Sequence, residues 1–206
     1  MNVIDRLVES GAVAIVRAQD QQGGQFIADA IVDAGLHCIE VTLTNPGALE
    51  IIASLASRVN VCVGVGTVLD PADVPRARRA GAMFVVSPNT NPDVIAATKN
   101  EGLISIPGVA TPSDVAIALK AGADVLKLFP ASSFGPAYLK ALRDPFPGNL
   151  WCPTGGMSVA TIPDWFAAGA TIVGLGGPLL KGGMDAIAAN VLAFTNAVRA
   201  AKELQA

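Results

Sequence analysis

The chain has 206 residues, of which 51% are hydrophobic and only 15% are charged, so it holds enough apolar material for the core of one domain. Fourteen basic and seventeen acidic side chains give a net charge of −3 without a basic run, which argues against nucleic acid and anionic membrane as partners. No apolar stretch approaches the roughly 18 residues of a transmembrane helix, and residues 1–9 show helical periodicity rather than a signal peptide. We therefore expect a cytoplasmic protein whose three cysteines, Cys38, Cys62 and Cys152, are reduced and buried.

After the short helix expected at the N-terminus, apolar runs alternate with helical patterns along the whole chain. The runs are rich in Val, Ile and Leu, which suits parallel strands covered on both faces. We expect eight strands, at residues 12–16, 38–42, 61–66, 83–87, 103–107, 125–129, 150–154 and 172–175. Helices fall between them, several with a proline in the first turn, and the last helix spans about residues 185–204.

A short step of a small residue and a glycine recurs where helical patterns end. It contains Gly35, Gly81, Gly102, Gly122 and Gly169, separated by one or two units of about 20 to 24 residues. Each glycine suits the left-handed conformation that ends a helix. Eight strand–helix units without a break predict a single-domain (β/α)8 TIM barrel over residues 1–206. A doubly wound open sheet is the alternative, since periodicity does not prove closure.

Charged side chains are almost absent from these strands. The exceptions are Arg17 at the end of the first strand, Glu40 in the second and Lys127 in the sixth. Inward residues at the C-terminal ends of barrel strands form active sites, so we expect an acid, an amine and a guanidinium to meet in one cavity. An ammonium in an apolar interior is costly, whereas a neutral amine is a nucleophile. A purely structural Glu40–Lys127 ion pair is the alternative.

Glycine pairs follow the last two predicted strands. Gly155-Gly156 follow the seventh strand and Gly176-Gly177 follow the eighth, where barrels commonly bind phosphate through backbone N–H groups. Thr67 adds a hydroxyl after the third strand, although its segment also suits a tight turn. With His37 as the only histidine, no cysteine cluster and few inward carboxylates, we expect neither a metal nor a cofactor.

Six motifs, in this order, resemble the 2-keto-3-deoxy-6-phosphogluconate and 2-keto-3-deoxy-6-phosphogalactonate aldolases. They are Ile39-Glu40-Val41-Thr42-Leu43, Gly64-Val65-Gly66-Thr67-Val68-Leu69, Ser87-Pro88, Ile106-Pro107-Gly108, Lys127-Leu128-Phe129-Pro130 and Pro153-Thr154-Gly155-Gly156. The resemblance covers nearly the whole chain. It implies a class I aldolase of Entner–Doudoroff-type metabolism, a (β/α)8 barrel and a homotrimer. The implied reaction splits a keto-deoxy sugar acid phosphate into pyruvate and glyceraldehyde 3-phosphate.

The resemblance also implies roles for particular residues. Lys127 matches the Schiff-base lysine, and Glu40 matches the general acid and base. Substrate-binding roles fall on Arg17, Thr67, Phe129 (against the pyruvyl unit), Thr154 (linked to stereochemical preference) and the phosphate cradle of Gly155, Gly156, Gly176 and Gly177.

Two segments depart from the gluconate-type pattern. Thr44-Asn45-Pro46 replaces an arginine-bearing segment and is nearer the galactonate type, as is Arg17. Gly177-Pro178 stands where the last phosphate loop usually has a serine, and proline removes a donor N–H. Two other functions compatible with the residues are another phosphate-binding barrel enzyme, such as a sugar-phosphate epimerase or decarboxylase, and a non-catalytic metabolite-binding barrel. The enzymes of the first class usually need a metal-binding or carboxylate-rich set of strands.

Overall fold

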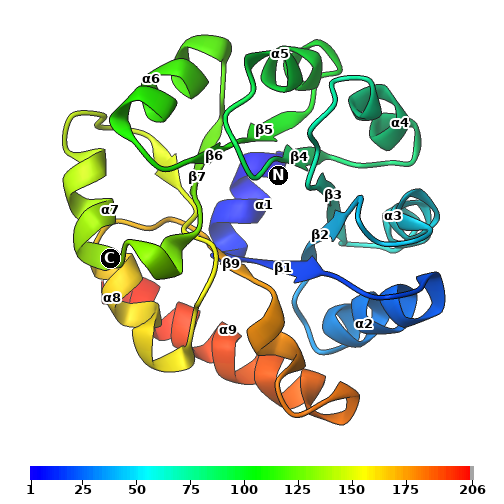
Figure 1. Cartoon of the computed structure of the whole chain (residues 1–206). Coiled ribbons are helices and arrows are strands. Elements are labelled where there is room, and N and C mark those ends of the chain that lie inside the picture. The colour runs from blue at the N-terminus through cyan, green and yellow to red at the C-terminus, as the bar shows by residue number, and fades with distance from the viewer. Residues whose placement is uncertain (205–206) are drawn as a thin grey trace.

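The computed structural model describes residues 1–204, so the last two residues of the predicted domain lie outside the described part. Strands surround a common centre, and the α-helices other than the N-terminal one lie outside them, as Figure 1 shows. The strands are β1 Ala12–Val16, β2 Cys38–Thr42, β3 Cys62–Gly66, β4 Phe84–Val86, β5 Ile104–Ile106, β6 Gly108–Val109, β7 Val125–Leu128, β8 Leu150–Trp151 and β9 Val173–Leu175. The predicted strands are thus confirmed in position, although several are shorter than expected.

The helices follow the predicted alternation. The α-helices are α1 Val3–Ser10, α2 Gln21–Asp33, α3 Ala48–Ala56, α4 Asp73–Arg79, α5 Pro92–Asn100, α6 Pro112–Ala121, α7 Pro136–Arg143, α8 Ile162–Ala167 and α9 Ile187–Glu203. Short 3-10 helices are η1 Ala131–Ser133, η2 Val159–Thr161, η3 Gly177–Leu180 and η4 Met184–Ala186. Within residues 1–204, no helix combines the length and the apolar character needed to cross a membrane.

The strands are parallel and form two sheets. Six strands follow the order β5-β4-β3-β2-β1-β9, and three follow the order β6-β7-β8. The predicted fifth strand, 103–107, is β5 alone, and a short strand that was not predicted, β6, follows Pro107, which has no N–H to donate to a ladder. Near the other junction, Thr154 and Gly174 form an isolated parallel bridge, and the Gly174 N–H donates to the Pro153 carbonyl at 3.0 Å. The observed fold is therefore an α/β fold built on parallel sheets.

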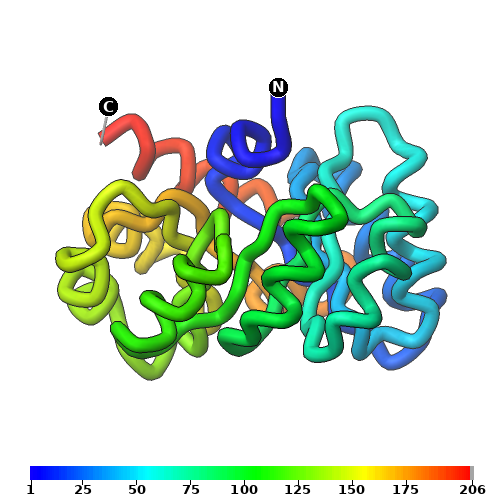
Figure 2. Tube along the Cα trace, turned by 90° about the horizontal axis from the view of Figure 1, so that it is seen from above, coloured from blue at the N-terminus to red at the C-terminus, as the bar shows by residue number. Residues whose placement is uncertain are grey.

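Two apolar clusters hold this fold together. The larger one packs the outer faces of the strands against the helices. The smaller one gathers inward side chains from most strands, including Val13, Cys62, Phe84 and Val125, and Leu7 of α1 joins it. Helix α1 lies across one end of the ring of strands (Figures 1 and 2), so the N-terminal helix covers the inner cluster.

The predicted helix-ending glycines adopt the expected conformation. Positive φ angles occur at Gly35, Gly81, Gly102, Gly122 and Gly169. A residue with a Cβ is disfavoured there, so the recurring glycine is required by the backbone at the end of each helix. The three cysteines are free and buried, as expected.

Candidate active site

Lys127 and Glu40 meet inside the ring, as the strand pattern predicts. Lys127 lies on the inner face of β7, and Glu40 lies on the inner face of β2 in the other sheet. Their side chains are only 5% and 3% exposed, and the Nζ–Oε2 distance is 3.9 Å. This distance allows attraction between the charged forms but exceeds that of a hydrogen bond. Two ionisable groups are thus held close together in an apolar interior.

The Glu40 carboxylate is only partly satisfied. Its Oε1 atom is buried and has no hydrogen-bond partner within residues 1–204. An unpaired buried acceptor lowers the free energy of unfolding by about 1–3 kcal/mol. Glu40 therefore does not serve stability at this atom, which points to a functional role. The carboxylate packs on the backbone of Gly66, where a Cβ would lie 1.9 Å from Oε1. A residue larger than glycine at position 66 would therefore displace the acid.

Phe129 connects the buried amine to an open cavity. The Lys127 Nζ lies 5.1 Å from the centroid of the Phe129 ring, which is within cation–π range. The same phenylalanine lines a cavity of about 290 Å³ at the C-terminal ends of β1, β8 and β9. A molecule bound in this cavity would contact the Phe129 ring, which lies beside the Lys127 amine.

The cavity brings together most of the remaining predicted residues. Its lining includes Arg17, Phe129, Thr154, Gly155, Gly156, Gly176 and Gly177. Sequence reasoning missed the apolar lining residues Ile15, Met157 and Leu180. The strand alternation from Arg17 back to Ile15 was a usable signal, whereas Met157 and Leu180 lie in irregular loops without a periodic pattern.

The two glycine pairs form part of the wall of this cavity. Gly155 and Gly156 have φ angles of +103° and +73°, a conformation that exposes backbone groups without a side chain. A Cβ at Gly177 would meet nothing within 4 Å, which leaves open space at the loop after β9. Backbone N–H groups and the guanidinium of the exposed Arg17 are suitable partners for an anion.

Thr154 is buried beside this wall. Its hydroxyl donates to the Cys152 carbonyl at 3.3 Å and occupies space that Gly174 leaves free, since a Cβ there would lie 2.2 Å from Thr154 Oγ1. Burial raises the pKa of the neighbouring Cys152 thiol to about 11, so this thiol is protonated at neutral pH and is a poor nucleophile.

Thr67, like Lys127 and Glu40, is a predicted residue outside the lining of the cavity. It follows Gly66 at the end of β3, is half-buried and has a φ angle of +59°. Positive φ is strained for a β-branched residue, and such strain gathers at functional sites. Thr67 is therefore held at the same end of the ring as Glu40.

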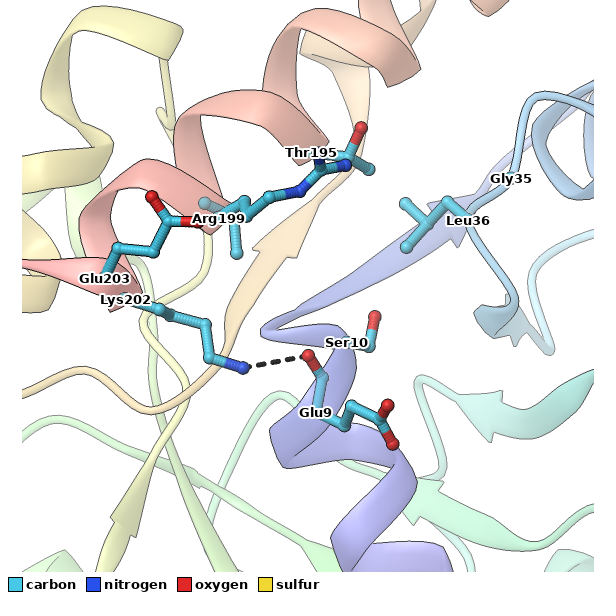
Figure 3. A pocket seen from close by; sticks show the side chains of 9 residues that line it. Glu9, Ser10, Gly35, Leu36, Thr195, Arg199, Lys202 and Glu203 are labelled. Carbon is cyan, nitrogen blue, oxygen red and sulfur yellow. Dashed lines mark hydrogen bonds between the residues drawn. The ribbon is translucent and has the colours of Figure 1, made fainter. Parts of the chain in front are cut away.

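A larger cavity, of about 520 Å³, lies near the N-terminal helix (Figure 3). It lies between the end of α1 and α9, and its lining includes Glu9, Arg199, Lys202 and Glu203. The Lys202 ammonium is used to bind backbone, donating to the Val8 and Glu9 carbonyls at 2.8 Å each. The buried acid–amine pair lies elsewhere, so cavity size alone does not identify the reactive site.

Comparisons with known proteins relate this chain to aldolases. Residues 3–193 match the sequence model of the family described as KDPG and KHG aldolase. The probable 2-dehydro-3-deoxy-6-phosphogalactonate aldolase of Rhizobium meliloti is 35% identical over 87% of this chain and 86% of its own. The 2-dehydro-3-deoxy-phosphogluconate aldolase of Pseudomonas aeruginosa is 37% identical over 80% of this chain and 76% of its own.

A solved structure resembles the fold. KDPG aldolase from Legionella pneumophila, with pyruvate captured as a covalent carbinolamine intermediate, has a TM-score of 0.81, 27% identity and coverage of 98% of each chain. These matches favour an aldolase over the epimerase, decarboxylase and non-catalytic alternatives. The chain belongs to the KDPG and KHG aldolase family.

Proposed function

We propose that this protein is a class I aldolase that splits a 2-keto-3-deoxy-6-phospho sugar acid into pyruvate and glyceraldehyde 3-phosphate. The observation that carries the proposal is the buried Lys127–Glu40 pair beside a cavity walled by glycine loops. A structural ion pair alone gives no reason for an unpaired carboxylate oxygen, whereas proton transfer needs a free one. The relatives named as gluconate and galactonate aldolases support the substrate class.

In the proposed reaction, the neutral Lys127 amine attacks the C2 ketone of the substrate. The carbinolamine loses water to give an iminium, which accepts the electron pair released when C3–C4 breaks. Glu40 delivers the proton for dehydration and removes the proton of the C4 hydroxyl, which becomes the aldehyde of glyceraldehyde 3-phosphate. Protonation of the enamine and hydrolysis of the imine then release pyruvate and restore Lys127. The iminium serves as the electrophile, so the proposed cycle uses no cofactor.

The cavity residues take the binding roles in this proposal. The glycines at positions 155, 156, 176 and 177 receive the 6-phosphate on their backbone N–H groups, and Arg17 adds positive charge. Phe129 packs against the pyruvyl unit, since its ring already lies beside Lys127. Thr67 binds the substrate from the end of β3.

We further infer that residues 1–206 form one closed (β/α)8 barrel. Strand β1 pairs with both β2 and β9, Pro107 joins β5 to β6, and the Thr154–Gly174 bridge links the segments after β8 and within β9. These links support closure at both junctions between the sheets. The family resemblance supports homotrimeric assembly, and the three free, buried cysteines support a cytoplasmic location.

The proposed substrate preference rests on Thr154. Its hydroxyl can bond to an oxygen near C4, as in the gluconate type, whereas Arg17 with Thr44-Asn45-Pro46 resembles the galactonate type. One such hydrogen bond contributes roughly 0.5–1.5 kcal/mol, which can bias stereochemistry but cannot enforce it. We predict cleavage of both C4 epimers with a modest preference for the gluconate configuration.

The test is a comparison of kcat/KM for both C4 epimers, each with and without the 6-phosphate. Thr154→Val should shift the ratio of kcat/KM values toward the galactonate configuration. A galactonate preference of several orders of magnitude in the wild type, unchanged in Thr154→Val, would show that Thr154 does not recognise C4.

A further inference from the structure

The side chain of Asn45 continues the pairing of two strands beyond their last residues. Asn45 lies just after β2 and is 4% exposed. Its Nδ2 donates to the Val16 carbonyl at 2.9 Å, and its Oδ1 accepts the Ala18 N–H at 2.6 Å. Both bonded groups belong to the chain leaving β1. They lie on either side of Arg17.

This arrangement reproduces a parallel β-bridge with a side chain in place of a backbone. In a parallel ladder, one residue donates to the carbonyl before its partner and accepts from the N–H after it. The backbone pairing of β1 with β2 ends at Val16 and Val41. The Asn45 amide supplies the next donor and the next acceptor, so Arg17 is held as though it were a strand residue.

The amide is itself fixed to β2. Its Nδ2 also donates to the Thr42 carbonyl at 2.9 Å, and the Asn45 N–H donates to the same carbonyl at 3.0 Å. Pro46 restricts the backbone of Asn45 to extended conformations. Both amide hydrogens and the amide oxygen are therefore used, and the side chain has one hydrogen-bonded orientation.

Arg17 has few constraints of its own. It is exposed, it lines the cavity with the glycine pairs, and it forms no ion pair within residues 1–204. An arginine side chain loses rotamer entropy when it binds, and a mobile backbone at its root would add to that loss, so a fixed backbone reduces the total cost of placing the guanidinium. Nothing else in the cavity lining carries a positive charge.

We propose that Asn45 is a positioning residue for Arg17, and that the two act as one unit in binding the anionic group held by the glycine loops. The proposal rests on the proposed function, because it assigns Arg17 to the phosphate end of the substrate. Asn45 acts only through Arg17 and touches no reacting atom. It also joins the two galactonate-like features of the sequence, Arg17 and Thr44-Asn45-Pro46, into one structural device.

A double-mutant cycle tests this coupling. Asn45→Ala and Arg17→Ala are made singly and together, and kcat and KM are measured with the phosphorylated substrate of whichever C4 epimer the wild type prefers. A lost charge-assisted contact made equally in ground and transition states raises KM and spares kcat. Asn45→Ala should therefore raise KM about 10-fold and change kcat less than about 3-fold. In the Arg17→Ala background, Asn45→Ala should change KM less than about 2-fold.

Two further variants separate positioning from stability. Asn45→Asp keeps the shape and the acceptor for Ala18 but loses the Nδ2 bonds to the Val16 and Thr42 carbonyls, so it should raise KM in the same way even where Asn45→Ala folds poorly. Thr98→Val removes another fully buried hydrogen bond, from Thr98 Oγ1 to the Val94 carbonyl in α5. This control should lower the melting temperature and leave KM within about 2-fold of the wild type.

The outcomes are distinct. An equal rise in KM on substituting Asn45 with and without Arg17, a loss confined to kcat, or no change in either constant would overturn the positioning role. Pyruvate trapping on Lys127 of the wild type is measured alongside and tests the proposed function separately, since pyruvate has no phosphate. If pyruvate is trapped on Lys127 but Asn45→Ala leaves KM and kcat unchanged, only the coupling between Asn45 and Arg17 is refuted.

Discussion

At the scale of single residues, the site depends on glycines that give up space to their neighbours. A Cβ at Gly64 would lie 2.3 Å from the Phe84 ring, and one at Gly66 would lie 1.9 Å from the Glu40 carboxylate. The presence of only three charges in otherwise apolar strands was enough to predict that Glu40 and Lys127 lie close together. The purpose of these glycines was not predictable, because it depends on which side chain of the adjacent strand faces each one.

The two glycines should therefore differ when replaced by alanine. Gly66→Ala should displace the Glu40 carboxylate and lower kcat by about 10²-fold, since proton transfer needs close geometry. Gly64→Ala should press on Phe84 in the inner cluster and lower the free energy of unfolding by about 1–3 kcal/mol through overpacking. Turnover assays and urea unfolding of both variants check the contrast. Normal turnover by Gly66→Ala would contradict the role given to the packing of Glu40.

At the scale of elements, the order and the type of most strands and helices follow from periodicity, whereas their ends do not. Apolar runs placed every strand except β6, which follows the break at Pro107, and β8 stops at Trp151, before Pro153. Proline cannot donate to a ladder, so both interruptions have a local cause that the apolar pattern conceals. The 3-10 helices η1 to η4 lie in loops with no repeating pattern and were not predicted.

The start of α6 allows a test of how an element is fixed by its first turn. Thr111 and Asp114 form a capping box at its N-terminus. Burial raises the pKa of the Asp114 carboxyl, but hydrogen bonds from the Thr111 hydroxyl and from the Ala110 and Thr111 N–H groups outweigh it, and the pKa falls below its ordinary value of 3.8. A lowered folded-state pKa stabilises the protein above the unfolded pKa, and this stabilisation is lost as pH falls through the folded pKa.

Asp114→Asn should accordingly lower the free energy of unfolding by about 0.5–1 kcal/mol at pH 7. The difference from the wild type should shrink as the pH falls below the ordinary pKa of 3.8, because the carboxyl of the unfolded chain is protonated first and that of the folded protein only at lower pH. Urea unfolding between pH 7 and pH 3 measures it. Asp93→Asn, in the first turn of α5 without a capping box, is the control. A difference that persists unchanged at pH 3 would refute the electrostatic explanation.

At the scale of the whole molecule, α1 and the last turn of α9 are in contact at the end of the ring opposite the reactive pair. Figure 2 shows the N-terminal and C-terminal helices on the same side of the molecule. Lys202 of α9 binds the last carbonyls of α1, and α1 contributes Leu7 to the inner cluster. The strand–helix repeat predicted an α/β fold with parallel strands, but contacts between residues nearly 200 positions apart leave no trace in local periodicity.

Lys202→Met should show that this contact supports stability without serving catalysis. It keeps the apolar stem and removes the two bonds to α1, so the free energy of unfolding should fall by about 1 kcal/mol. Values of kcat and KM should stay within about 2-fold, because the site lies at the other end of the ring. Lys140→Met, on the exposed face of α7, is the matched control for loss of a charge. A large fall in kcat for Lys202→Met would imply coupling between the two ends.

The central claim is that Lys127 is the nucleophile, and covalent trapping tests it most directly. The protein is incubated with pyruvate, treated with borohydride and digested, and the peptides are analysed by mass spectrometry. We predict that the peptide containing Lys127 gains the mass of one reduced pyruvate unit, and that Lys127→Ala folds but shows neither the adduct nor cleavage. An adduct on another lysine, or no adduct in active wild-type protein, would contradict the assignment of Lys127.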